Sequence, residues 1–192
     1  MKKLFLILAL VPRLLLAQSA FQNGSMQNGQ IGVAASGGGG GGDTAFVTSV
    51  AHLDGSISGL NWEIGMGVTP PSTITITAIG RYCYSGDSGT HTLNIRSTGC
   101  TILGTVSINM SGATPGTWVY ATLGTPVVVT GGTKVFINSV ETSASGDHWG
   151  YNATTITTAF GTPGTDTQAQ DNNGCTGHAG QTEGPVNFLF HY

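Results

Sequence analysis

The residues best suited to chemistry lie close together late in the chain. Two carboxylates (Glu141, Asp147), a histidine (His148) and two large aromatics (Trp149, Tyr151) fall within one short stretch. Aromatic rings stack on the apolar face of a sugar ring, and carboxylates accept hydrogen bonds from its hydroxyls. These five residues are therefore candidates for binding a carbohydrate.

The aromatic residues also fit the interior of a β-protein. Trp149 and Tyr151 are separated by one glycine, so both would lie on the same face of a strand. Trp118 alternates with Tyr120 in the same way, and it is a candidate either for the core or for an exposed ligand platform. Trp62 alternates with aliphatic residues and is expected in the core. Core packing is the favoured interpretation, because large aromatics dominate core energetics.

No motif indicates a catalytic centre. Glycoside hydrolysis needs two carboxyls on either side of the scissile bond, and Glu141 with Asp147 is the close acidic pair that could supply them. No serine lies in a complete nucleophile elbow, since the segment Gly86–Gly89 has only a defective form of that motif. We therefore expect a protein that is not an enzyme, with glycoside hydrolase as the alternative.

No cofactor is expected, and a structural Ca²⁺ is the ion that the sequence leaves open. Ca²⁺ takes about six to eight oxygen ligands, and Asp43, Asp54, Asp87 or Asp147 could supply some of them. No contiguous calcium loop is present, and the five histidines have no diagnostic spacing. Whether a metal binds is therefore unknown from the sequence.

The start of the chain has the order of residues that marks a secretory signal. Two lysines precede an apolar run from Leu4 to Val11, and small residues such as Ala17 and Ala20 offer cleavage sites. The run is too short to cross a bilayer, which needs about 20 residues. Residues 1–20 are expected to be a signal peptide, and the protein to be secreted and extracellular or on a cell surface.

A glycine-rich segment separates this leader from the rest. Residues 21–44 contain the six consecutive glycines Gly37–Gly42 and no apolar period that a core could bury. Glycine carries the largest entropy cost of ordering, so the segment is expected to be a flexible linker. Residues 45–192 then form one domain.

The charge of the mature chain excludes several partners. Three of the six basic residues lie in the leader and all nine acidic residues lie beyond it, which leaves three against nine and a net charge of −6. Nucleic acid and anionic membrane surfaces both need a basic footprint. We expect neither a nucleic-acid partner nor membrane insertion after the signal is cleaved.

The domain has a β pattern throughout. Short runs rich in Val, Ile, Thr and Tyr alternate with turn residues, and Ile74, Ile76 and Ala78 share one face of such a run. Leu93 and Ile95 share the inward face of the next. So many short strands need closure, so we expect an all-β, antiparallel, jelly-roll-like β-sandwich. Strands are expected near 45–51, 57–66, 73–84, 90–97, 101–109, 117–122, 126–130, 133–141, 148–158 and 185–191.

Two turns and one disulfide follow from this pattern. The turn residues 85–89 predict a hairpin between the strands on either side, and Gly131–Gly132 predict a second tight return. A disulfide is permitted in an exported chain. Cys83 and Cys100 are the favoured pair because they flank the first hairpin, which leaves Cys175 free or bonded to another molecule. The other pairings of the three cysteines remain open.

An ordered series of segments resembles one known family, and these segments are 76–81, 88–95, 106–108, 112–120, 123–129, 132–137, 139–141, 146–149 and 154–158. It is similar to the secreted bacterial β-sandwich modules grouped as domain of unknown function 4082, from about Phe46 to Phe160 with a closing strand near 184–188. The resemblance implies a jelly-roll-like sandwich, an extracellular location and association with carbohydrate or a surface. It assigns no catalytic or binding residue.

Two functions are expected from these features. The favoured one is a non-catalytic extracellular module that binds a polysaccharide or a cell-surface glycan. The alternative is a self-associating structural subunit of a surface layer, fibre or appendage, which the glycine spacer, low charge and unpaired cysteine favour.

Overall fold

The computed structural model describes most of the expected domain. The described residues contain strands and no helix, which confirms the all-β prediction. Nothing in this part of the chain forms a helix that is long and apolar enough to cross a membrane. The predicted signal peptide and nearly all of the predicted linker lie outside the described residues. These are 42–50, 56–57, 61–142, 148–150, 156–161, 168–171, 175, 177–178 and 186–192.

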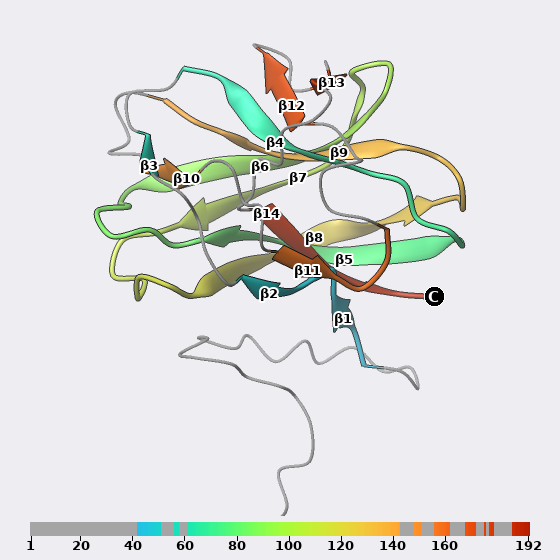
Figure 1. Cartoon of the computed structure of the whole chain (residues 1–192), viewed down its shortest axis with the longest axis horizontal. Helices are drawn as coiled ribbons and strands as arrows, with labels where there is room; N and C mark the ends of the chain where they lie inside the picture. Colours follow the sequence, from blue (N-terminus) through green and yellow to red (C-terminus); the bar gives the residue numbers. More distant parts are fainter. Residues whose placement is uncertain are drawn as a thin grey trace, which may run out of the picture.

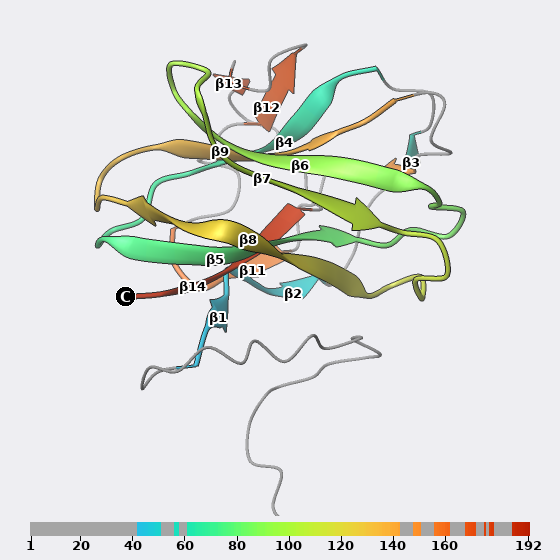
Figure 2. The ribbon, with the colours of Figure 1, turned by 180° about the vertical axis from the view of Figure 1, so that it is seen from behind.

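Two antiparallel sheets face each other and form the sandwich (Figures 1 and 2). The smaller has the order β1-β14-β5-β8 and the larger the order β13-β12-β4-β9-β6-β7. The smaller sheet consists of β1 (Thr44–Ala45), β14 (Val186–His191), β5 (Ile74–Tyr82) and β8 (Trp118–Val129). The larger consists of β13 (Gly177–His178), β12 (Gln168–Asp171), β4 (Glu63–Val68), β9 (Val135–Val140), β6 (Thr90–Ser97) and β7 (Ile102–Asn109).

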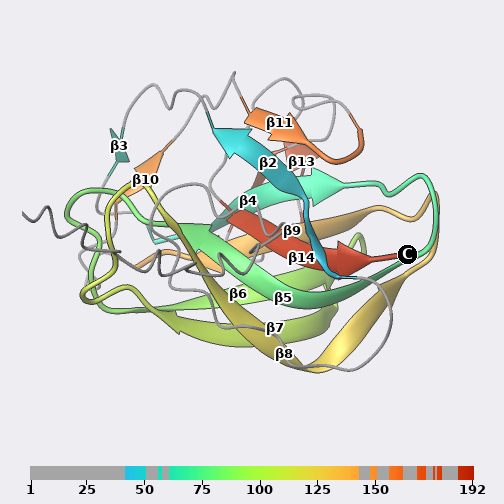
Figure 3. The ribbon, with the colours of Figure 1, turned by 90° about the horizontal axis from the view of Figure 1, so that it is seen from below.

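Two further strand pairs lie beside the sheets. They are β2 (Val47–Val50) with β11 (Ile156–Thr158), and β3 (Ser56–Ile57) with β10 (Trp149–Gly150). Figure 3 shows β2 and β11 together on the side of the sandwich where β14 runs. Phe46 precedes β2 and stacks on Phe188 of β14, with ring centroids 4.6 Å apart. Phe160, just after β11, packs on Phe46 at 4.8 Å, so the aromatics join this pair to the main core.

The core lies between the two sheets and follows the predicted alternation. Ile74 and Ile76 of β5, and Leu93 and Ile95 of β6, are all at most 1% exposed. A bulge between Ile76 and Ala78 shifts the register of β5 against β8. Ala78 is buried as well, but beyond the bulge Ile79 is the residue that joins the core cluster.

Both predicted tight returns connect different sheets and form no hairpin. The residues 85–89 link β5, which pairs with β14 and β8, to β6, which pairs with β7 and β9. Gly131–Gly132 link β8 to β9, again across the sandwich. Moreover, β8 is one continuous strand where two were expected. The prediction was wrong because alternation shows which face of a strand is buried and says nothing about its partner.

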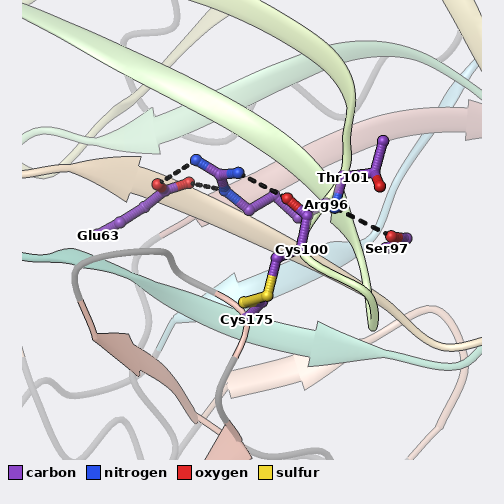
Figure 4. Close-up of a disulfide and its surroundings, with 6 residues drawn as sticks. All are labelled: Glu63, Arg96, Ser97, Cys100, Thr101 and Cys175. Atoms are coloured by element: carbon purple, nitrogen blue, oxygen red, sulfur yellow. Dashed lines mark hydrogen bonds and ion pairs between the residues drawn. A yellow bond between two sulfur atoms is a disulfide. The ribbon is translucent and has the colours of Figure 1, made fainter.

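The disulfide joins Cys100 to Cys175, and the predicted bond between Cys83 and Cys100 is therefore wrong (Figure 4). Cys83 is a free, buried cysteine at the end of β5. Cys100 lies in the turn beyond the far end of β6, in the opposite sheet. The two cannot meet because no hairpin brings them together. The bond that forms ties the turn between β6 and β7 to the segment between β12 and β13.

An ion pair lies beside this disulfide. Arg96 donates from Nε and Nη2 to the two carboxylate oxygens of Glu63 on β4, both at 2.7 Å. Its Nη1 donates to the carbonyl oxygen of Cys100 at 2.9 Å (Figure 4). Asn94 adds a third donor to Glu63 at 2.9 Å. The cysteine turn is thereby connected to β4, the strand on which β12 docks.

Candidate functional site

Arg81 is the centre of a buried ion cluster between the sheets. β5 directs it inward, and its side chain is fully buried. It donates from Nε and Nη2 to the carboxylate of Glu141 at 3.2 and 3.0 Å. Its Nη1 donates to Asp87 at 2.5 Å. One guanidinium thus holds two carboxylates that come from different loops.

Asp87 extends the cluster to the backbone around it. Its carboxylate accepts hydrogen bonds from the amides of Tyr84 at 2.9 Å and His148 at 2.8 Å. Arg81 donates to the carbonyl of His148 at 3.0 Å. The ring of His148 lies against Gly86, where an added Cβ would be 2.7 Å from Nε2. The cluster therefore fixes both the crossover between the sheets and the residue that precedes β10.

His91 completes the cluster, which we call the ion cluster (Arg81, Asp87, His91, Glu141). Its Nδ1 is 3.7 Å from Glu141 and its Nε2 donates to the carbonyl of Ser88 at 3.1 Å. Burial raises the pKa of Glu141, although Arg81 opposes the shift. Burial alone would lower the pKa of Arg81, but the charges of Glu141 and Asp87 outweigh it and the pKa is raised. The four side chains are sealed from solvent and hold elements together.

A group of partly exposed aromatics, the aromatic row (Tyr84, Tyr82, Trp118, Tyr120), lies on β5 and β8, with Tyr84 two residues beyond the end of β5. Tyr82 is paired with Trp118 across the two strands, and their ring centroids are 5.2 Å apart. Tyr84 packs on Tyr82 at 5.5 Å, and Trp118 on Tyr120 at 6.4 Å. All four side chains are partly exposed, so the row combines rigid packing with access to solvent.

Gly80 and Asn187 fix the position of Tyr120, the last residue of the aromatic row. Gly80 lies opposite Tyr120, and a Cβ there would be 2.6 Å from two ring carbons of that tyrosine. The hydroxyl of Tyr120 accepts a hydrogen bond from Asn187 at 2.7 Å. Asn187 is fully buried and also bonds the amide and carbonyl of Val47. Burial strongly raises the pKa of Tyr120, so its hydroxyl stays protonated.

We expect Gly80→Ala to destabilise the protein by about 1–3 kcal/mol, because the new methyl group overpacks the ring of Tyr120. Gly124→Ala on β8 is the matched control, since a Cβ there meets no atom within 4 Å. The free energy of unfolding, measured by urea denaturation, compares the two. Equal effects of both substitutions would show that Tyr120 does not depend on Gly80.

A family model described as a domain of unknown function, DUF4082, matches residues 50–188. The chain belongs to this family. The matched range contains the whole aromatic row and the whole ion cluster of this DUF4082 protein, and it confirms the resemblance seen in the sequence. No curated protein matches the chain.

The DUF4082 fold brings together only some of the six predicted binding residues. Glu141 lies in the ion cluster, where Arg81 takes both of its oxygens. His148 contacts that cluster through its backbone, and Trp118 belongs to the aromatic row. The backbone of Trp149 forms part of β10, but its side chain lies outside the described part, as do Asp147 and Tyr151. Because Asp147 lies outside the described residues, its pairing with Glu141 stays a prediction.

The structure also bears on the predicted position of Trp62 and on the predicted calcium ligands. Trp62 is 42% exposed, so its predicted place in the core is wrong. The buried stretch begins only at Glu63, the first residue of β4, all six residues of which are buried. Of the predicted calcium ligands, Asp43 contacts Thr77 and His191, at 2.5 and 2.8 Å. Asp87 binds Arg81, and Asp54 and Asp147 lie outside the described residues. Within the described ranges no three His, Cys, Asp or Glu residues are grouped to hold a metal.

The sequence contained a signal for the ion cluster that our predictions missed. Arg81 alternates with Ile79 and Cys83, both of which are buried at 1% or less. A charged residue at an inward position of a strand must find a charged partner, because an unpaired buried charge is very unfavourable. No comparable signal in the sequence indicated that Tyr82 and Tyr84 belong to the aromatic row, because the aromatic residues on β8 are distant in sequence.

Proposed function

We propose that this protein is a non-catalytic extracellular module that binds a polysaccharide or a cell-surface glycan through the aromatic row. The observation that carries the proposal is the packing of four partly exposed aromatic side chains, three on the adjacent strands β5 and β8 and the fourth just beyond the end of β5. Aromatic faces offer apolar area to a sugar ring with little loss of conformational entropy. Neighbouring strands of one sheet hold these faces in fixed positions.

The rest of the described site supports binding rather than acid–base chemistry. A general acid or base must come within hydrogen-bond distance of the substrate. Glu141 and Asp87 are sealed in the ion cluster, and Arg81 bonds both of them. The extracellular part of the proposal is supported by the leader pattern and is compatible with the disulfide.

We expect the purified protein to bind at least one polysaccharide on a glycan array, and Trp118→Ala to weaken that binding by about tenfold. Loss of a stacking face removes an interaction of about 1 kcal/mol or more. Trp62→Ala is the matched control, because Trp62 is an exposed tryptophan away from the row. Background-level binding to every glycan on the array would contradict the proposed function. So would an equal loss of glycan binding in Trp118→Ala and Trp62→Ala.

A structural subunit of a surface layer, fibre or appendage is the second candidate function. The observation that favours it is a set of exposed apolar residues, Ile102 at 48%, Leu103 at 44% and Val128 at 65%. Ile102 and Leu103 lie on β7, the last strand of the larger sheet, and edge strands tend to pair with other chains. Sedimentation over a wide concentration range tests this, and a strictly monomeric protein would exclude it.

A further inference from the structure

The structure points to a more specific ligand for the aromatic row: we propose an uncharged glycan, bound as a single chain and not as a crystalline surface. This inference rests on the proposed function. It concerns the class of glycan, which the proposed function leaves open.

The cationic residues exclude an acidic glycan. Carboxylate, sulfate and phosphate groups are recognised mainly by arginine and lysine. Beyond the leader the sequence has only three such residues, Arg81, Arg96 and Lys134. Arg81 is sealed in the ion cluster. Arg96 forms a bidentate pair with Glu63 on the opposite sheet. Lys134 immediately precedes β9 of that sheet and lies over the ring of Phe136.

The net charge of the protein also disfavours an acidic glycan. The mature chain has nine acidic residues against three basic ones. A protein with this net charge repels a polyanion at long range, and the repulsion is strongest at low ionic strength. An uncharged polysaccharide experiences no such repulsion. Its hydroxyls require neutral hydrogen-bond partners, and the phenol of Tyr82 is such a group. Burial raises the pKa of Tyr82, so this phenol keeps its proton at neutral pH.

The ring orientations indicate how the glycan is presented. The planes of Tyr82 and Tyr84 differ by 69°, those of Tyr82 and Trp118 by 73°, and those of Trp118 and Tyr120 by 38°. A crystalline polysaccharide presents a flat surface, which needs coplanar rings to contact several residues together. A single chain rotates about its glycosidic bonds, so successive sugars can meet rings at different angles. The row therefore suits an isolated chain.

The test uses the full protein with three sets of probes at pH 7.5. The first is soluble neutral glycans (glucan, xylan, mannan and galactan), the second is acidic glycans (polygalacturonate, alginate and heparin), and the third is crystalline cellulose and chitin. We expect at least one soluble neutral glycan to bind about tenfold more tightly than every acidic one. The affinity for the neutral glycan should be the same at low and high salt. Crystalline cellulose and chitin should retain no more of the wild-type protein than of the variant Tyr82→Ala.

Variants separate failure of this inference from failure of the proposed function. Tyr82→Ala and Tyr84→Ala should each weaken neutral-glycan binding, Tyr82→Phe should weaken it less than Tyr82→Ala because the ring remains, and Lys134→Ala should leave it unchanged. Thermal unfolding checks that every variant folds. Preferred binding of an acidic or crystalline glycan that still requires Tyr82 and Trp118 would overturn the inference and keep the proposed function. Binding of no glycan, or binding insensitive to the row, would overturn both.

Discussion

Arg81→Met is expected to lower the free energy of unfolding by about 3–5 kcal/mol at pH 7. Methionine keeps most of the volume but removes the cation, so the carboxylates of Glu141 and Asp87 lose the partner that both contact. An uncompensated buried charge is one of the few single changes with so large an effect. Urea denaturation of the purified protein measures it.

The effect of Arg81→Met should also depend on pH. In the native protein the pKa of Glu141 is raised by burial and lowered by Arg81, with burial dominant. Loss of Arg81 raises it further, so the folded variant binds a proton more tightly than the unfolded chain does. That contribution is present below the unfolded pKa and is lost as the pH rises through the folded pKa. The deficit of the variant should therefore shrink as the pH falls from 7 towards the ordinary pKa of a glutamate.

The double variant Arg81→Met/Glu141→Gln is the control for this mechanism. Glutamine removes one of the two stranded charges, so the double variant should recover part of the stability and lose most of the pH dependence. A loss below about 1 kcal/mol for Arg81→Met would contradict the mechanism, since paired buried charges normally show larger effects. So would a deficit that grows on acidification.

Cys175→Ser is expected to destabilise the oxidised protein by about 2–4 kcal/mol. The bond spans 75 residues of sequence, and a crosslink across a long loop removes much conformational entropy from the unfolded chain. It also holds the segment between β12 and β13 beside the turn that follows β6. Because β12 pairs with β4 over only four residues, its amides should lose protection against hydrogen exchange before those of β6 and β9.

Two comparisons isolate the disulfide in this prediction. Cys83→Ala changes a cysteine that is not in the bond, so it should cause only the small loss expected for a buried side chain. A thiol reductant should destabilise the wild type and leave Cys175→Ser unchanged. If the reduced wild type is as stable as the oxidised protein, the bond makes no contribution to stability.

The sequence predicted the faces of strands better than their partners. Ile74, Ile76, Leu93 and Ile95 are buried as expected, because alternation follows directly from the geometry of one extended strand. The partners of β5 are β8 and β14, and β14 is more than a hundred residues away. No local turn signal carries that information. The cysteine prediction was wrong for the same reason, since it depended on a hairpin that does not exist.

The candidate site was predicted only in part. The sequence singled out Trp118, Glu141 and His148 as one candidate site, but the structure places them in two different arrangements. Glu141 faces Arg81 because β9 and β5 lie in opposite sheets, and only the packing of the sheets reveals that contact. Tyr82 reaches Trp118 because the two strands are in register. Such pairings arise from the tertiary fold, so a single sequence without its strand order does not show them.

The position of the disulfide has a consequence for biosynthesis. Cys83 and Cys100 are synthesised well before Cys175. In an oxidising compartment a growing chain therefore first presents two thiols that are not bonded to each other in the native protein. The native state avoids this bond by burying Cys83 at the end of β5, where 1% of its surface is exposed. In such a compartment, the native pairing forms directly when Cys83 is buried before the thiols are oxidised, and otherwise the early bond has to be reshuffled. Yield under oxidising expression should accordingly improve when position 83 carries no sulfur.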